Sequence, residues 1–228
     1  GHGAPITALS RHGWAPLGHA TPLPAPRPAP PLPVAAGVAA MARAIRTACR
    51  EAPWQAGLDG FRPQLQDAWR AMDAAARARF LRHGRTAWNI HRHRLPPAVA
   101  ALLAAAEAAG TLRRRAGRLA GFTPGAARLA DGAVLPARHL ILCTGPDAGG
   151  GLRAQPLVAA LLADGLLQAD AHGLGLLADP ATLEAAPGLH LLGPATRALL
   201  WEATAVPELR AQAALVAARL AGANSTGG

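Results

Sequence analysis

The chain has 228 residues, which is enough for one large domain or two small ones, and 51% of them are hydrophobic, which is enough for a buried core. No uncharged apolar run reaches the roughly 18 residues of a membrane-spanning helix, which excludes that class of protein. Two cysteines are too few for a disulfide framework, and they indicate a reducing, cytoplasmic location.

The basic charge of the chain comes from arginine alone. There is no lysine, and 23 arginines against 13 acidic residues make a formal net charge of +10. Such a charge permits binding of nucleic acid or of an anionic ligand. Abundant Ala, Gly, Pro and Arg also suggest a GC-rich coding sequence, so we expect a solvated basic surface and no nucleic-acid partner.

The amino-terminal part is predicted to contain one strand, a connector and several helices. Residues 6–9 favour a short strand closed by a polar turn. The proline-dense stretch 21–33 predicts an extended connector rather than a PxxP ligand. Apolar residues at helical spacing predict helices over 34–49 and 65–72, and Asp73 is a suitable N-cap for a third helix.

The character of the chain changes after residue 95. Pro97 can begin a helix whose apolar face includes Leu102 and which Gly110 ends. Three strands then form a meander, with turns at Pro124-Gly125 and Asp131-Gly132. The remaining predicted elements are the meander strands 111–122, 126–129 and 134–143, a helix over 156–162, a strand over 173–176 and a closing helix from Pro207.

Two stretches share one plan, in which an apolar strand stops at Gly-Pro. The first is RHLILCTG (138–145), whose continuous apolar run predicts a strand buried on both faces of a parallel sheet. The second is GLHLLGP (188–194), with a helix start after it. Ligands bind beyond the carboxyl ends of such strands, and Gly145 permits close approach of a ligand. We therefore expect the seat of a phosphate-bearing or flavin cofactor here.

Four motifs resemble one family of flavoproteins. LILCTGP (140–146) and LLGPATRALLWEATAVPELRAQA (191–213) resemble the carboxyl-terminal part of FAD/NAD(P)-binding oxidoreductases of the FAD-dependent urate hydroxylase and L-aspartate N-monooxygenase types. ITALSRHGWAPLGH (6–19) is similar to the second strand of that family's NAD(P) domain, and IHRHRLPP (90–97) to part of its helical insert.

The resemblance implies an α/β fold, an incomplete two-dinucleotide-domain, Rossmann-like flavoprotein with a helical insertion and a β-meander. It also implies a division of the chain into four segments. These are 1–33, a remnant of the NAD(P)-binding domain plus the proline-rich connector; 34–95, the helical insertion; 96–137, the end of the NAD(P)-binding domain and the meander; and 138–228, the carboxyl-terminal part of the FAD-binding domain.

The same likeness implies contacts with FAD. Backbone N–H groups before the last helix, at its positive end, would stabilise negative charge on a reduced flavin ring. Pro194 stands where many such proteins have an Asp that holds the ribityl hydroxyls, so that hydrogen bond is unassigned. Core packing for Trp201 and a helix-entry charge for Glu202 are equal alternatives. The expected FAD contacts are Thr144, Gly145, Pro146, Gly193, Pro194, Trp201, Glu202, Thr204, Ala205 and Val206.

Ser10 and Arg11 are the expected NADPH contacts. They follow a strand end, and a guanidinium beside a small hydroxyl suits the 2′-phosphate because it binds phosphate in bidentate fashion. The alternative for Arg11 is an ordinary exposed loop residue, which the resemblance makes the weaker choice.

No catalytic residue or metal site is assigned. His91 and His93 lie two residues apart, a spacing that directs them to different sides of a helix, and no cysteine or carboxylate cluster stands beside them. No Ser-His-Asp or Cys-His arrangement can be identified.

The glycine loops of a dinucleotide-binding fold are missing, since no G-x-G-x-x-G occurs in the chain. We therefore expect an amino-terminally truncated, inactive portion of an FAD-dependent oxidoreductase, an NAD(P)H-using monooxygenase acting on a small molecule. One alternative is a catalytically silent flavoprotein-like scaffold. Another is an Arg-rich helical module that binds nucleic acid or a protein partner, although it leaves the two strand-Gly-Pro units unexplained.

Overall fold

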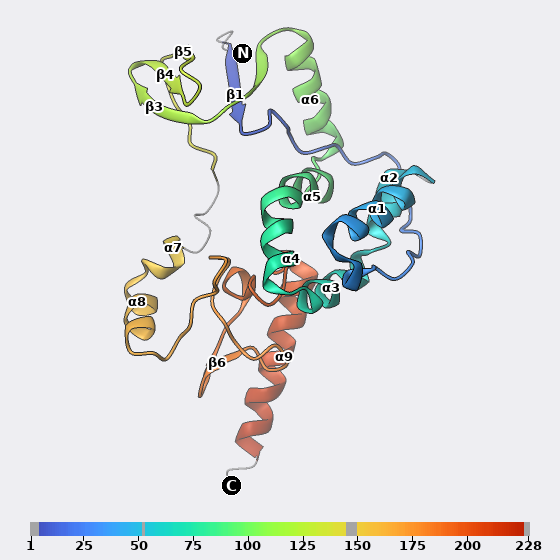
Figure 1. The fold of residues 1–228 in the computed structure, drawn as a ribbon, viewed down its shortest axis with the longest axis vertical. Coiled ribbons are helices and arrows are strands. Elements are labelled where there is room, and N and C mark those ends of the chain that lie inside the picture. Colours follow the sequence, from blue (N-terminus) through green and yellow to red (C-terminus); the bar gives the residue numbers. More distant parts are fainter. Residues whose placement is uncertain (1–4, 52, 145–149, 226–228) are drawn as a thin grey trace. The chain divides into compact units, whose positions relative to one another are not determined.

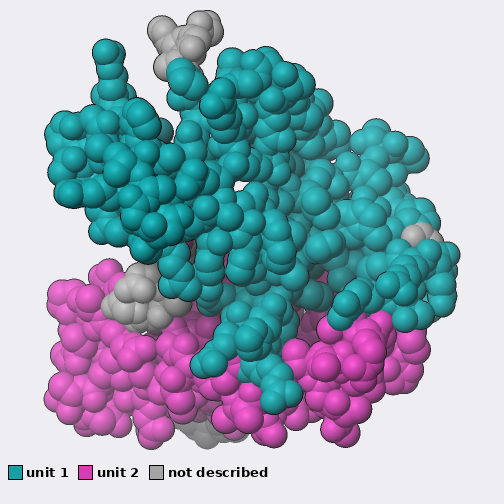
Figure 2. Space-filling view, turned by 45° about the horizontal axis from the view of Figure 1, so that its top comes forward, with its two compact units in different colours: residues 1–29, 45–60, 79–143 teal, residues 30–44, 61–78, 144–228 magenta. Residues whose placement is uncertain are grey.

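The computed structural model describes residues 5–51, 53–144 and 150–225 (Figure 1). The chain forms two compact units (Figure 2). Unit 1 comprises residues 1–29, 45–60 and 79–143, and unit 2 comprises residues 30–44, 61–78 and 144–228. Each unit takes residues from several of the four predicted segments, whose boundaries remain predictions.

Unit 1 contains two small sheets. Strand β1 (Ile6–Ser10) pairs in parallel with β2 (Leu112–Ala116), and helix α6 (Pro97–Ala108) leads into β2. The antiparallel meander consists of β3 (Leu119–Thr123), β4 (Gly125–Leu129) and β5 (Val134–Ala137). The predicted strand 6–9 and the meander are thus confirmed, except that the first meander strand is broken near Gly117 and the last one ends at Ala137 instead of at residue 143.

The helical region begins after the proline-dense stretch, which has neither helix nor strand over 21–33. The predicted helix over 34–49 is confirmed as a 3-10 turn (Val34–Ala36) followed by α1 (Gly37–Arg50). The Asp73 carboxylate accepts the Ala76 N–H at 2.7 Å, which is the expected N-cap. The other helices here are α2 (Trp54–Asp59), η2 (Arg62–Gln64), α3 (Leu65–Ala71), α4 (Ala74–Arg79), the π-helix η3 (Phe80–Gly84) and α5 (Arg85–Arg92).

The carboxyl-terminal part of unit 2 combines helices with one short hairpin. Helix α8 (Pro156–Ala163) and the long α9 (Val206–Ser225) confirm the two helices expected there. The hairpin pairs β6 (Glu184–Ala186) with β7 (Leu189–His190) in antiparallel fashion. Short helices complete it, α7 (Gly150–Arg153) and the 3-10 helix η4 (Gly193–Thr196).

The buried parallel strand predicted over 138–145 is wrong for its described residues. Residues 140–144 have no regular structure, and Ile141 is 82% exposed. A strand requires a partner for its backbone N–H and C=O groups, and no described strand pairs with this run. Cys143 is exposed for the same reason.

Three further predictions are corrected. The second strand-Gly-Pro unit is only the two-residue β7, paired with an antiparallel neighbour instead of a parallel one. The strand over 173–176 is reduced to one bridge, between Ala169 and Leu176. Leu102 of α6, expected to face inward, is 68% exposed, because nothing in the described chain covers that side of the helix. Apolar character alone does not supply a packing partner.

The largest fully buried side chains of the described chain lie in unit 2. Trp69, Phe61, Leu176, Leu183 and Thr196 are the largest fully buried ones. One cluster of unit 2 joins Leu167, Leu176 and Leu191. None of the helices in the described part of the chain combines the length and apolarity that a membrane crossing requires. The described chain is therefore a mixed α/β protein with small sheets.

Candidate functional site

In unit 1, the expected NADPH contacts lie at the carboxyl end of β1, beside its parallel neighbour β2. The Ser10 carbonyl accepts N–H groups from Gly13 at 3.2 Å and from Gly117 at 3.0 Å, so the turn after β1 is tied to the end of β2. The Arg11 guanidinium is exposed and makes no hydrogen bond or ion pair with any described residue. This edge of a parallel pair is where open α/β sheets bind ligands.

Two aromatic rings that the sequence analysis did not select follow Arg11 in the chain. The His12 and Trp14 rings lie 4.9 Å apart, and Trp14 is 51% exposed. The Ser10 hydroxyl donates to the Trp14 carbonyl at 3.3 Å, which links these rings to the strand end. A Trp three residues after an Arg, in a predicted turn, is the sequence signal that could have identified this pair.

The predicted FAD contacts over residues 193–206 of unit 2 form one segment, which begins at Gly193. Its φ of +67° lies in the left-handed region, which favours glycine. Its N–H donates to the Gln212 side-chain carbonyl at 2.8 Å, and its own carbonyl accepts the Thr196 hydroxyl at 2.8 Å. The Gly193 N–H and C=O groups therefore both bond within the protein. What Gly193 can offer a ligand is close approach to a backbone without a side chain.

Gln212 is the residue of this segment that the sequence analysis missed. It is 4% exposed, on the face of α9 that also buries Val216. Because the Gly193 N–H requires an acceptor, the Gln212 side-chain carbonyl must face Gly193. Gln212 lies three residues after Leu209 and four before Val216, so the helical period alone marked it as inward-facing.

Trp201 and Glu202 are core residues, each 6% exposed. The Trp201 ring lies 4.9 Å from the Trp69 ring, and the Arg197 guanidinium lies over the Trp201 ring, 4.8 Å from its centroid. The Trp69 indole N–H donates to the Ala198 carbonyl at 2.9 Å. These contacts give Trp201 a packing role in unit 2, while its contact with a flavin stays a prediction.

Thr204 to Val206 form the accessible part of the segment. Thr204 and Val206 are exposed, and Val206 begins the 20-residue helix α9. The N-terminal N–H groups of a helix carry partial positive charge and favour anions. The acidic residue of the first turn, Glu208, is paired with Arg62 at 2.7 Å, which offsets its charge near this end.

Of the remaining predicted FAD contacts, those at residues 144–146 are separated from this segment in the sequence, whereas Pro194 lies within it. Thr144 is exposed and has no regular structure, and Gly145 and Pro146 lie outside the described residues. Pro194 is exposed at the start of η4. The described structure thus gathers the contacts from Gly193 to Val206 in unit 2, whereas Ser10 and Arg11 belong to unit 1.

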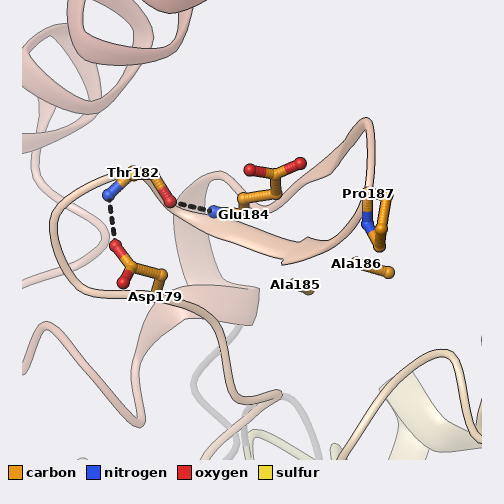
Figure 3. A pocket seen from close by; sticks show the side chains of 6 residues that line it. All are labelled: Asp179, Thr182, Glu184, Ala185, Ala186 and Pro187. Atoms are coloured by element: carbon orange, nitrogen blue, oxygen red, sulfur yellow. Dashed lines mark hydrogen bonds between the residues drawn. The ribbon is translucent and has the colours of Figure 1, made fainter.

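A pocket of about 400 Å³ lies elsewhere in unit 2 (Figure 3). The polar groups along it already have internal partners. Asp179 accepts N–H groups from Ala181 and Thr182, and Glu184 accepts the Gly188 N–H. The pocket contains no predicted site residue, and its lining residues are Asp179, Thr182, Glu184, Ala185, Ala186 and Pro187.

A polar cluster in the helical part of unit 1 is structural. The Arg94 guanidinium binds both Asp59 carboxylate oxygens at 2.8 Å and lies 4.8 Å over the Trp54 ring. Burial raises the pKa of the nearby Cys49 thiol, Arg94 and Arg27 act to lower it, and Asp59 adds to the increase. His91 packs edge-on against Trp54. The described residues contain no group of three or more His, Cys, Asp or Glu side chains placed to hold a metal ion.

Comparison with known proteins finds no matching family model, no matching curated protein and no matching solved structure.

Proposed function

We propose that the intact protein is an FAD-dependent oxidoreductase of monooxygenase type, which uses NADPH and acts on a small molecule in the cytoplasm. In this proposal the chain belongs to a two-dinucleotide-domain, Rossmann-like architecture and carries part of each cofactor site. Bound flavin would supply the redox chemistry, and the chain would supply placement and electrostatics.

The order of elements over residues 189–225 carries the proposal. Strand β7 leads to a left-handed glycine, then a tight turn, then a long helix with an exposed positive end. Gln212 and Thr196 hold the Gly193 peptide in place, so the chain can present a rigid, side-chain-free surface there. The N–H groups near Thr204 and Val206 would favour an anionic ring.

The parallel pair β1–β2 supports the nicotinamide part of the proposal. Ser10 and Arg11 lie at its carboxyl edge, where Arg11 is free to bind a phosphate. Arg11 would bind the 2′-phosphate in bidentate fashion and so select NADPH over NADH.

Flavin titration of a charge-matched pair of variants tests the FAD site. Val206 is 68% exposed, so Val206→Glu should fold normally and place a negative charge at the positive end of α9. We expect it to weaken FAD affinity about fivefold, measured by flavin fluorescence, whereas Ala217→Glu adds the same charge in mid-helix and should leave affinity unchanged. The titration uses the intact protein, and absence of flavin binding there, or equal losses in the two variants, would contradict the assignment.

Nucleotide titration tests the second site. Arg11→Gln should lower affinity for NADPH toward that for NADH, while the exposed Arg50→Gln should leave the preference intact. If Arg11→Gln lowers the affinity for NADPH and for NADH equally, Arg11 does not recognise the 2′-phosphate.

A catalytically silent flavoprotein-like scaffold is the competing proposal. It is favoured by the packing of Trp201 against Trp69 and by the internal partner of the Gly193 N–H, which leave these groups engaged within the protein. FAD binding without NADPH-driven flavin reduction in the intact protein would support the scaffold.

A further inference from the structure

The basic charge of the chain is concentrated in unit 1 (teal in Figure 2). Unit 1 has 15 arginines and four acidic residues, for a formal charge of +11 with neutral histidines. Unit 2 has eight arginines and nine acidic residues, for a charge of −1, and the two values add to the chain's +10.

Codon bias does not explain this division. A GC-rich coding sequence would enrich arginine in both units alike, and it would not remove acidic residues from only one of them. The two units contain 110 and 118 residues, so their lengths do not explain it either. The charge therefore follows the tertiary division of the chain, although each unit is assembled from three separate sequence segments.

The few acidic residues of unit 1 are already paired. Glu51 pairs with Arg27, Asp59 with Arg94 and Asp131 with Arg115. The fourth, Glu107, pairs with Arg114. Every carboxylate of this unit thus already pairs with an arginine, so the 15 arginines of unit 1 far outnumber the carboxylates that could offset their charge.

Several of these other arginines are exposed on different elements. Arg11 follows β1, Arg113 lies on β2, Arg128 lies on β4, and Arg118 lies between β2 and β3. Their side chains make no hydrogen bond or ion pair with any residue in the described ranges. Like charges that are left uncompensated in this way destabilise a compact unit, and a bound polyanion removes that repulsion.

We infer that unit 1 binds single-stranded nucleic acid through its uncompensated arginines and the exposed ring of Trp14. A nucleic-acid strand presents phosphates along its whole length, so it can engage several guanidinium groups at once. Trp14 is 51% exposed, and its ring is tilted against that of His12, so it adds an aromatic face on which a base can stack.

Fluorescence anisotropy with a labelled 20-nucleotide single-stranded DNA tests the inference on the full chain. For about six phosphate contacts, affinity should fall roughly 300-fold between 50 and 200 mM salt. The triple variant Arg113→Gln, Arg118→Gln, Arg128→Gln should reduce the slope of log affinity against log salt by about 2. Trp14→Ala should weaken binding about fivefold or more.

A charge-matched triple variant in unit 2 is the control. Arg153→Gln, Arg210→Gln, Arg219→Gln removes the same charge from exposed positions and should leave affinity within about twofold of wild type. Three outcomes would overturn the inference: no binding at 50 mM salt, equal losses in the two triple variants, or poly-glutamate displacing the DNA at equal charge concentration. The last would point to an acidic protein partner. Because none of these measurements uses FAD or NADPH, the inference and the proposed function can fail separately.

Discussion

Unit 1 and unit 2 are similar in length, but different interactions hold them together. Unit 2 is nearly neutral and contains the largest buried side chains, including Trp69 and Phe61. Unit 1 has a charge of +11, and few of its apolar residues are buried, among them Leu58 and Leu129. A net charge near zero and a real core favour the folded state, whereas a thin core under like-charge repulsion depends on ion pairs and on bound anions.

Arginine itself has two uses in these units. In unit 2 Arg77 and Arg197 lie over the rings of Trp69 and Trp201, at 5.0 and 4.8 Å, so that they cover the aromatic core. In unit 1 Arg94 has a comparable role, over Trp54. The chain's net charge of +10 therefore describes neither unit. An arginine count can be interpreted only once it is known which arginines belong to which unit.

Trp69→Ala should have the largest effect and should act on unit 2. The ring is 2% exposed, donates to the Ala198 carbonyl and packs on Trp201, so its removal leaves a cavity and should cost about 3–5 kcal/mol. Urea unfolding measures the loss, and hydrogen exchange locates it. The exposed Trp14→Ala should change stability by at most about 0.5 kcal/mol. Equal loss of amide protection in both units would contradict the view that Trp69 stabilises unit 2 in particular.

Asp59→Asn should be the corresponding change in unit 1. The Arg94 side chain is 2% exposed, so loss of the carboxylate leaves a buried guanidinium without its counter-charge, at a cost of about 3 kcal/mol. Asp67→Asn is the matched control, because the Asp67–Arg70 pair is exposed and should contribute about 0–1 kcal/mol. Both are measured by urea unfolding with exchange mapped to each unit. Similar costs for the two variants would show that unit 1 does not depend on buried ion pairs.

Gln212→Met tests whether the hydrogen bond from the Gly193 N–H to Gln212 stabilises unit 2. Methionine keeps the volume of the side chain but leaves the buried Gly193 N–H without an acceptor, so we expect a loss of about 1–3 kcal/mol in unit 2. The exposed Gln168→Met is the control and should be near neutral. If both variants unfold at the same urea concentration as wild type, the Gly193 peptide is not held by Gln212.

The smallest expected effect is an acid dependence of unit 2 at Asp179. Hydrogen bonds from Ala181 and Thr182 lower the pKa of this carboxyl below its ordinary value of 3.8. Its stabilising contribution is therefore full above that value and is lost as pH falls through the lowered pKa of the folded state. Asp179→Asn should be less stable than wild type at neutral pH and converge with it in acid. NMR titration of the carboxyl and pH-dependent unfolding test this, and a constant difference across pH would contradict it.

Local elements were predictable from the sequence because their causes are local. The Asp73 cap forms with the neighbouring Ala76, and Gly110 ends α6 with a φ of +69° that its lack of a Cβ permits. Strand β1 and helix α9 were likewise indicated by propensity and period. Part of the candidate site follows the same rule, since the contacts from Gly193 to Val206 are neighbours along the chain.

The sequence alone was enough to place helices, caps and turns and to give the total charge. Which apolar runs are buried, and which arginines share a unit, depends on the tertiary structure. The two strand-Gly-Pro stretches look alike, yet residues 140–144 are exposed while Leu191 joins a core. The physical reason is that burial, strand pairing and charge compensation depend on partners far away in the chain, as Gly193 and Gln212 or Asp59 and Arg94 show.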